Sequence, residues 1–182
     1  MYCQLLEQTV HKLTNDGVPE QIEHTSVDIG VFGYIPKAYI PSDTRRIEVY
    51  RRLATARTQE QIDLVVADIT SAYSDPPELV RRLILRARVR AACQTLHIRS
   101  IGLREKDIVA LSSAPDHARE CLAGAPANVR VVEGQLVQTN ARTSSGGAMC
   151  EIYIRPDAPP NSPVQRAKLL LDWFESGQPA RA

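Results

Sequence analysis

The segment from Asp75 to Leu96, DPPELVRRLILRARVRAACQTL, constrains the fold more than any other part of this sequence. Asp75 can cap a helix through its side chain, and Pro76 suits the first turn, where its missing N–H costs nothing. Glu78 then places a negative charge where the helix dipole favours it. The sequence therefore predicts a helix from about Pro76 to about Thr95.

Two apolar stripes run along this helix when successive residues are placed about 100° apart. The first stripe consists of Val80, Leu83, Ile84, Ala87 and Ala91. The second stripe, on another side, consists of Leu85, Val89, Ala92 and Leu96. A helix that is apolar on two sides must be packed on both, so we expect it to be the central helix. The exposed arc that remains is expected to carry Arg81, Arg82, Arg86 and Arg90.

Helical patterns come before this segment. The face Ile47, Tyr50, Leu53 and Ala54 predicts a helix that Ser42 or Asp43 caps. A second helix is predicted by the spacing of Ile62, Val65, Val66, Ile69 and Tyr73, with Thr58 and Gln61 at capping-box spacing. The alternation of Val27, Ile29 and Val31 indicates a short strand ahead of both helices.

After residue 97, apolar and polar residues mostly alternate with a period of two. They predict one hairpin from 98–103 and 108–111, a second from 129–132 and 136–139, and a strand over 151–155. Short helices are expected at 115–123 and 164–175. We therefore predict an α+β fold in which N-terminal helices, one of them central and buried on two sides, pack on a small antiparallel sheet of hairpins, with a C-terminal helix.

Composition limits the classes of function. The 182 residues are 43% hydrophobic, enough for a real core, and 22 Lys and Arg against 21 Asp and Glu leave a net charge of +1. This balance gives no overall argument for a nucleic-acid or membrane partner. No apolar run approaches the roughly 20 residues of a membrane span, and we expect a cytoplasmic, monomeric fragment. The four cysteines are far apart and are expected to be reduced thiols.

No catalytic, cofactor-binding or metal-binding residue can be nominated. The phosphate-binding pattern G-x-x-x-x-G-K-[ST] does not occur in the sequence, so this chain alone should not hydrolyse nucleotide. His117 and Cys121 lie four residues apart and could share a metal or form a nucleophile and base. A surface histidine and a buried cysteine explain the pair more simply, because the other members of either motif are missing nearby.

The arginine-rich stretch at 81–90 has three interpretations. Its guanidinium groups could bind phosphates, or they could pair with carboxylates on a protein partner. In the third interpretation they are a solvated helix face whose side-chain stems cover apolar surface. The absence of aromatic residues within the stretch counts against a nucleic-acid groove.

The segment from about Asp28 to Leu111 resembles the C-terminal domain of the bacterial transcription-repair coupling factors, the Mfd family. The motifs that carry the resemblance are YIP at 39–41, RRIEVYRRLA at 45–54, PPELV at 76–80, ARVR at 87–90 and LHIR at 96–99. Residues 1–6 also resemble the helix that ends the motor domain of that family. The resemblance implies four parts: the end of the motor at 1–13, a linker at 14–26, the C-terminal domain at 27–177 and a tail at 178–182.

The resemblance implies a non-catalytic regulatory domain. Full-length members of the family are ATP-dependent DNA translocases that use ATP and Mg²⁺ in a motor, displace RNA polymerase and recruit UvrA. Their C-terminal domain acts as an autoinhibitory clasp, which packs on the N-terminal UvrB-like module and masks the UvrA-binding surface. On this interpretation Arg81, Arg82, Arg86 and Arg90 would bind that module, and the alternative is a nucleic-acid-binding module that uses the helix at 81–90.

The sequence departs from the family pattern at two positions where the family usually has glycine. Ser74 follows the aromatic residue of the second helix, and His97 follows the central helix. We expect either that His97 ends that helix in backbone geometry that is less permissive for a residue with a side chain, or that the turn differs locally.

Overall fold

The computed structural model describes residues 25–105, 107–132 and 149–176. In chain order the elements are β1 (Ser26–Asp28), α2 (Asp43–Thr55), α3 (Gln59–Tyr73), α4 (Glu78–Thr95), β2 (Ile98–Arg104), β3 (Asp107–Ser112), α5 (Pro115–Leu122), β4 (Ala127–Val132), β5 (Cys150–Pro156) and α6 (Pro163–Ser176). The helix expected at 1–13 and the tail at 178–182 lie outside the described residues.

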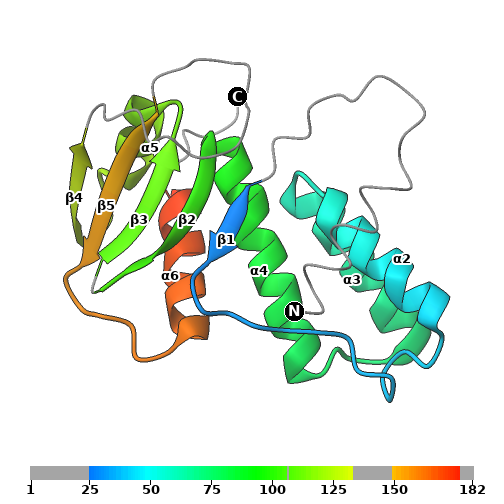
Figure 1. The fold of residues 1–182 in the computed structure, drawn as a ribbon. Helices are drawn as coiled ribbons and strands as arrows, with labels where there is room; N and C mark the ends of the chain where they lie inside the picture. Colours follow the sequence, from blue (N-terminus) through cyan, green and yellow to red (C-terminus); the bar gives the residue numbers. More distant parts are fainter. Residues whose placement is uncertain (1–24, 106, 133–148, 177–182) are drawn as a thin grey trace, which may run out of the picture.

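Helix α4 lies in the middle of the molecule, with α2 and α3 on one side and the sheet on the other (Figure 1). Its first predicted stripe belongs to a cluster of buried residues shared with α2 and α3. Its second stripe belongs to another cluster, shared with the sheet and α6. The prediction of a central helix buried on two sides is confirmed. We call the first cluster the helical core and the second the sheet core.

The helical core is closed by α2 and α3, and each begins with a side-chain cap. Ser42 Oγ accepts a hydrogen bond from Arg45 N, and Thr58 Oγ1 accepts one from Gln61 N. The buried face predicted for α3 is confirmed, because its inward positions Ile62, Val65 and Ile69 are buried.

The face predicted for α2 is wrong in part. Val49 and Leu53 are its buried residues, whereas Ile47 is 52% exposed and Ala54 is exposed. Apolar residues are sparse on this arginine-rich helix, so two different faces fit the helical spacing. Packing against α4 buries the face of α2 that contains Val49.

The sheet has five described strands in the order β1-β2-β3-β5-β4. The first predicted hairpin is confirmed as β2–β3, in which Leu103 pairs with Ile108. Strand β5 pairs antiparallel with both β3 and β4, and the predicted strand at 136–139 lies outside the described residues. The α+β fold class is confirmed. One detail was not foreseen: β1 pairs with β2 in parallel, which makes the sheet mixed.

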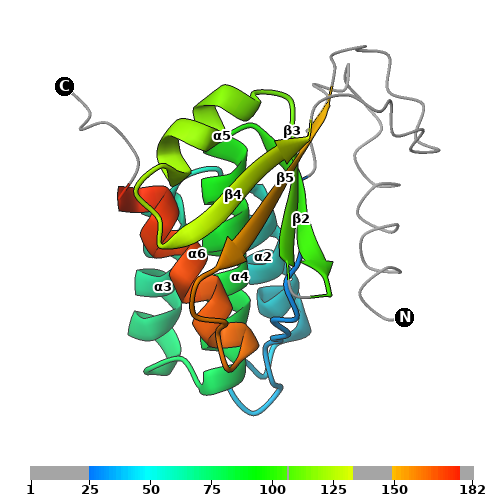
Figure 2. The same cartoon turned by 90° about the vertical axis from the view of Figure 1, so that its left-hand side faces the viewer.

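Helices α4, α5 and α6 lie on the same side of the sheet (Figure 2). The sheet core lies between these helices and the sheet, and Phe174 of α6 and Ile152 of β5 are fully buried in it. Among the described helices, none combines the length and the hydropathy of a membrane-spanning segment.

Three described residues other than glycine hold backbone geometry that favours glycine: Glu105 in the β2–β3 turn, with φ 57°, and the residues that follow α3 and α4. Ser74 follows α3 with φ 92° and ψ −175°, and His97 follows α4 with φ 54°. These are two positions at which the resembling family usually has glycine, and the expectation for His97 is confirmed. Each position costs free energy of about 1 kcal/mol or more for a residue with a Cβ. The chain keeps both turns because tertiary contacts fix them: the Tyr39 hydroxyl, for example, donates to the Ser74 carbonyl at 2.8 Å.

Candidate functional site

The four arginines nominated on α4 differ in their surroundings. Arg81 and Arg86 are exposed and form no salt bridge within residues 25–105, 107–132 and 149–176. Arg82 is partly exposed, and its Nε donates to Glu78 Oε1 at 2.9 Å. Among the four nominated arginines, Arg81 and Arg86 are therefore the exposed ones whose charge has no neighbouring carboxylate in the described structure.

Arg90 does not point to solvent as expected. Its guanidinium donates to the carbonyl oxygens of Leu53, Ala54 and Ala56, the last at 3.0 Å, and so binds backbone groups that the end of α2 leaves without partners. Burial lowers the pKa of Arg90, and the charge of Arg86 acts in the same direction. Arginine nevertheless stays protonated in proteins. The expected exposure of Arg90 is wrong, because the side chain ties α4 to α2.

The exposed arginines also lie on different sides of α4. Five positions separate Arg81 from Arg86, which corresponds to about 140° around the helix. Arg81 lies on the side of Arg88, whose guanidinium pairs with Asp63 of α3 at 2.5 Å. Arg86 lies on the side of Arg90, which faces α2. The single exposed arc expected from the sequence is therefore wrong, and a partner that contacts Arg86 does not reach Arg81 across the same flat surface.

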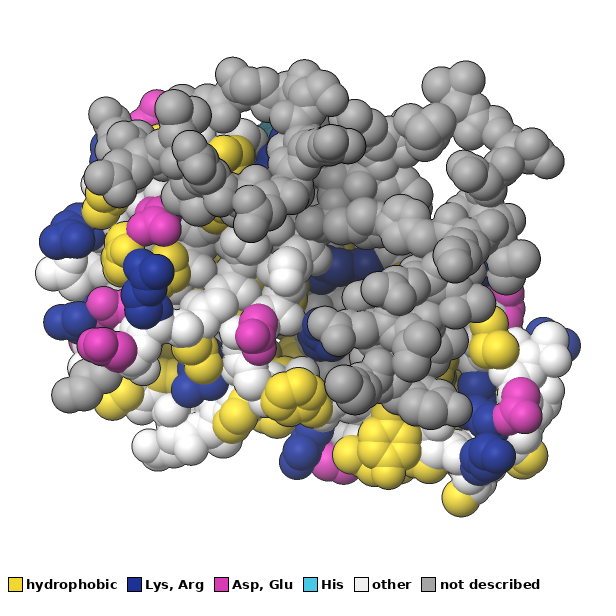
Figure 3. All heavy atoms as spheres, viewed as in Figure 1, with side chains coloured by type: hydrophobic (Ala, Val, Ile, Leu, Met, Phe, Trp, Pro, Cys, Tyr) yellow, Lys and Arg dark blue, Asp and Glu magenta, His cyan; other side chains and the backbone are white. Residues whose placement is uncertain are grey.

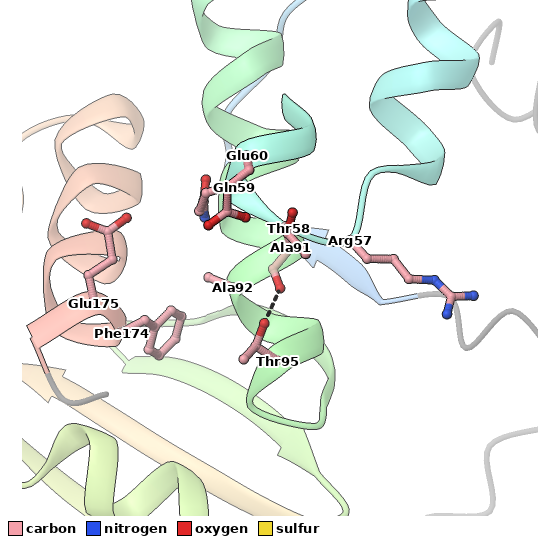
Figure 4. A pocket seen from close by; sticks show the side chains of 9 residues that line it. All are labelled: Arg57, Thr58, Gln59, Glu60, Ala91, Ala92, Thr95, Phe174 and Glu175. Carbon is pink, nitrogen blue, oxygen red and sulfur yellow. Dashed lines mark hydrogen bonds between the residues drawn. The ribbon is translucent and has the colours of Figure 1, made fainter. Parts of the chain in front are cut away.

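A cavity of about 260 Å³ lies where the α2–α3 turn, α4 and the end of α6 meet (Figure 4). Glu60 and Glu175 bring carboxylates to its lining, while Arg57 points away from it. The buried Gln59 Oε1 has no hydrogen-bond partner, although Gln59 Nε2 donates to the Arg88 carbonyl at 3.2 Å. This polar, acidic lining does not suit a phosphate group.

The pair His117 and Cys121 does not form a reactive site. Cys121 is buried, and both burial and the charge of Glu120 raise the pKa of its thiol, which disfavours the nucleophilic thiolate. The His117 ring faces the His97 ring, with centroids 6.4 Å apart. In the part of the chain that the structure describes, no three His, Cys, Asp or Glu side chains come close enough to hold a metal ion.

Two exposed aromatic residues were not predicted from the sequence. Phe32 is 74% exposed and Tyr34 is 55% exposed, in the segment that leaves β1 and leads to α2. The signal was available, because Val31, Gly33 and Ile35 alternate with them in an extended stretch next to a proline.

A family model described as "TRCF domain" matches residues 29–120. This range contains most of the segment from Asp28 to Leu111 that carries the resemblance, and the resemblance is confirmed.

Curated relatives named transcription-repair-coupling factor are similar to more than half of the chain. The one from Mycobacterium tuberculosis is 35% identical over 102 residues, which are 55% of this chain and 8% of the relative. The one from Escherichia coli is 27% identical over 110 residues, which are 58% of this chain and 10% of the relative. The matched part of this chain thus spans a tenth or less of the length of these relatives.

A solved structure described as "Crystal structure of C-terminal domain of transcription-repair coupling factor" has a similar fold. The superposition has a TM-score of 0.61, covers 85% of this chain and 91% of that chain, and shows 14% sequence identity. At this identity the similarity concerns the fold alone.

Proposed function

This chain belongs to the TRCF domain family, and from that premise we propose that it is a non-catalytic regulatory domain of a transcription-repair coupling factor. In this proposal it acts as an autoinhibitory clasp in transcription-coupled nucleotide excision repair. It packs on the N-terminal UvrB-like module of the same protein and masks the surface that binds UvrA. Contacts with RNA polymerase, DNA, ATP and Mg²⁺ belong to other parts of that cytoplasmic protein.

The observation that carries the proposal is the pair of exposed charges on a helix that cannot move freely. Helix α4 belongs to both cores, so its position relative to the rest of the domain is fixed. Arg81 and Arg86 project from it without a described ion-pair partner. Because the helix is already fixed, binding a carboxylate there orders only the arginine side chain and not the backbone.

A clasp must hold its partner and also release it, so moderate affinity is required. Arginine contacts at the edge of an interface suit this need, because solvent-exposed ion pairs contribute little each and respond to competing partners. A large apolar interface would hold too tightly to be opened by a conformational change elsewhere.

Nucleic-acid binding by the helix at 81–90 is the second candidate. The arginines themselves favour it, whereas their neighbours do not. Arg82 and Arg88 are paired with Glu78 and Asp63, and Arg81 and Arg86 lie on different sides of the helix. A phosphate backbone would meet carboxylates beside the paired guanidinium groups, which reduces the electrostatic attraction.

The proposal is tested by titrating this 182-residue chain with the N-terminal half of its parent protein. We expect micromolar binding that UvrA competes for. Charge reversal on the side of α4 that makes the contact, by Arg81→Glu or by Arg86→Glu, should weaken it by about threefold to tenfold. Lys168→Glu, a reversal at an exposed position on α6, is the matched control and should leave the affinity unchanged. A wild-type chain that does not bind the N-terminal half contradicts the clasp. Affinity for duplex DNA that falls steeply with salt supports the second candidate instead.

A further inference from the structure

The extended segment from Val31 to Ile35 passes between the two cores and alternates inward and outward side chains. Val31 is buried in the sheet core and Ile35 in the helical core, each only 4% exposed. Between them Phe32 is 74% exposed and Tyr34 is 55% exposed. The only other phenylalanine in the chain, Phe174, is fully buried.

The backbone of this segment is held in place, and the aromatic rings therefore cannot turn inward. A Cβ on Gly33 would lie 2.4 Å from both Leu79 O and Leu83 N, so the segment lies directly on the backbone of α4. Two residues later, Ile35 N donates to the Tyr50 hydroxyl at 2.7 Å. Because residues 33 and 35 are fixed, Phe32 and Tyr34 are preorganised in solvent.

Arginines border the turn of α4 on which Gly33 lies. Arg86 is within about 60° of Leu79 and Leu83 around the helix axis, and Arg82 is next to it on the same side. Figure 3 shows hydrophobic side chains along the segment that follows β1, with Lys and Arg side chains above them between the sheet and α2. Arg86 has no described carboxylate partner, so the charge on this side of α4 is not fully balanced.

We infer that Phe32, Tyr34 and Arg86 form a docking surface for a protein segment that presents carboxylates beside an apolar side chain. Aromatic residues and arginine are the types enriched at the centre of protein interfaces, where a few of them supply most of the affinity. The inference rests on the proposed function and places the clasp contact on the side of α4 that faces α2, away from Arg81.

Charge and chain length indicate which partner binds this docking surface. An arginine without a described carboxylate partner, next to two exposed rings, is complementary to an acidic and partly apolar surface. The carboxylate of Glu78 lies beside Arg82 on α4, which disfavours a nucleic-acid strand stacked on the same rings. The matched part of this chain amounts to a tenth or less of its curated relatives, so most of the parent protein lies outside it and can supply this surface.

The probe is the N-terminal UvrB-like module of the parent protein, titrated with the full 182-residue chain by calorimetry. The double variant Phe32→Ser/Tyr34→Ser should lose at least about thirtyfold in affinity, as removal of central aromatic residues does, and Arg86→Glu about tenfold. Leu64→Ser and Ile47→Ser are matched controls, because these apolar residues are 67% and 52% exposed on α3 and α2. Each control should change the affinity less than about twofold.

The outcomes of this titration test the docking surface and the clasp separately. A wild-type chain that binds while the aromatic double variant binds equally well overturns this inference and leaves the clasp standing. A wild-type chain that does not bind the module overturns both. Loss of oligothymidine binding in the double variant, with module binding unchanged, overturns the inference in favour of single-stranded nucleic acid. Thermal unfolding should be unchanged in the double variant because both side chains are exposed, and Phe32→Ser alone repeats the test if the double variant does not fold.

Discussion

The helical core and the sheet core use the same helix, but they differ in how their residues are spread along the chain. The helical core is built from residues 35–91, in which successive helices pack on their neighbours. The sheet core joins residues 27–31 to strands and helices as far along as Phe174. Because α4 gives one apolar stripe to each, a core made of local contacts and a core made of long-range contacts depend on a single element.

The first prediction tests whether the two cores unfold together, and it has the largest expected effect. Phe174→Ala in the sheet core should destabilise the domain by about 3–5 kcal/mol, and Ile69→Ala in the helical core by about 2–5 kcal/mol. Both side chains are almost fully buried. Each variant should unfold in one transition in urea, followed by circular dichroism, because neither core can lose α4 and persist.

Leu64→Ala on the surface of α3 is the control for these truncations and should change the free energy of unfolding by less than about 0.5 kcal/mol. Two separate transitions in either core variant would contradict the shared dependence on α4, since they would show that one core survives without the other.

The second prediction concerns the link between α4 and α2. Arg90→Met keeps the apolar stem but removes the hydrogen bonds to the carbonyls of Leu53, Ala54 and Ala56. We expect a loss of about 2 kcal/mol, because buried acceptors lose charged donors. Arg86→Met, one turn away and exposed, should be nearly neutral in the same chemical denaturation experiment. Equal effects of the two variants would contradict the capping role of Arg90.

The third prediction concerns the turn after α3, which leads the chain to α4. Ser74→Gly should stabilise the domain by about 1 kcal/mol, because glycine adopts φ 92° without a Cβ penalty. The carbonyl of residue 74 remains to accept the Tyr39 hydroxyl. A rise in the midpoint of thermal unfolding checks this, with Ser71→Gly inside α3 as a control that should lower it. No change in Ser74→Gly would show that this turn carries no strain.

The fourth and smallest effect lies at the surface of the sheet. Arg155 donates to Asp107 Oδ1 at 2.6 Å, and this hydrogen bond holds the pKa of the Asp107 carboxyl below its ordinary value, with the charge of Arg155 acting in the same direction. A carboxyl whose pKa is lower in the folded state stabilises the fold above its unfolded pKa of about 3.9, and this contribution is lost as the pH falls through the folded value.

Asp107→Asn should therefore reduce stability slightly at neutral pH and leave it unchanged in strong acid, below the folded pKa of Asp107, as measured by thermal unfolding across this range. Asp116→Asn on α5 is the control, since Asp116 is exposed and its oxygen lies 4.0 Å from Arg119. A greater loss at acidic than at neutral pH in the Asp107 variant would contradict this assignment.

Much of the fold could be predicted because the helical signals are local. The two stripes of α4 and the caps of α2 and α3 depend on residues a few positions apart. The expected Asp75 cap of α4 is wrong, because the N-cap is Pro77 and no side chain caps this helix. The buried face of α2 could not be predicted, since an arginine-rich helix offers two faces of similar apolar content. The parallel pairing of β1 with β2 joins residues distant in the chain, such as Ser26 and Ser100, and nothing local specifies it.

The candidate site was harder to predict for the same reason. The sequence analysis placed Arg81, Arg82, Arg86 and Arg90 on one surface because they are close together in the chain. The groups that surround each of them, however, belong partly to other helices. Arg90 has a structural role because its guanidinium donates to a backbone carbonyl at the end of α2. Phe32 and Tyr34 are exposed because Gly33, which lies between them in the chain, packs against the backbone of α4.

Residue spacing alone was enough to show that a helix with two apolar stripes would be central and that a hairpin would follow it, and short sequence motifs showed which family the chain resembles. These properties depend on the order of residues, which the sequence contains in full. Tertiary packing was needed to establish which arginines remain without a described carboxylate, which face of α2 is buried and which aromatic rings stay in solvent. Those properties depend on backbone atoms contributed by distant segments, and a side chain shows its role only when those atoms are in place.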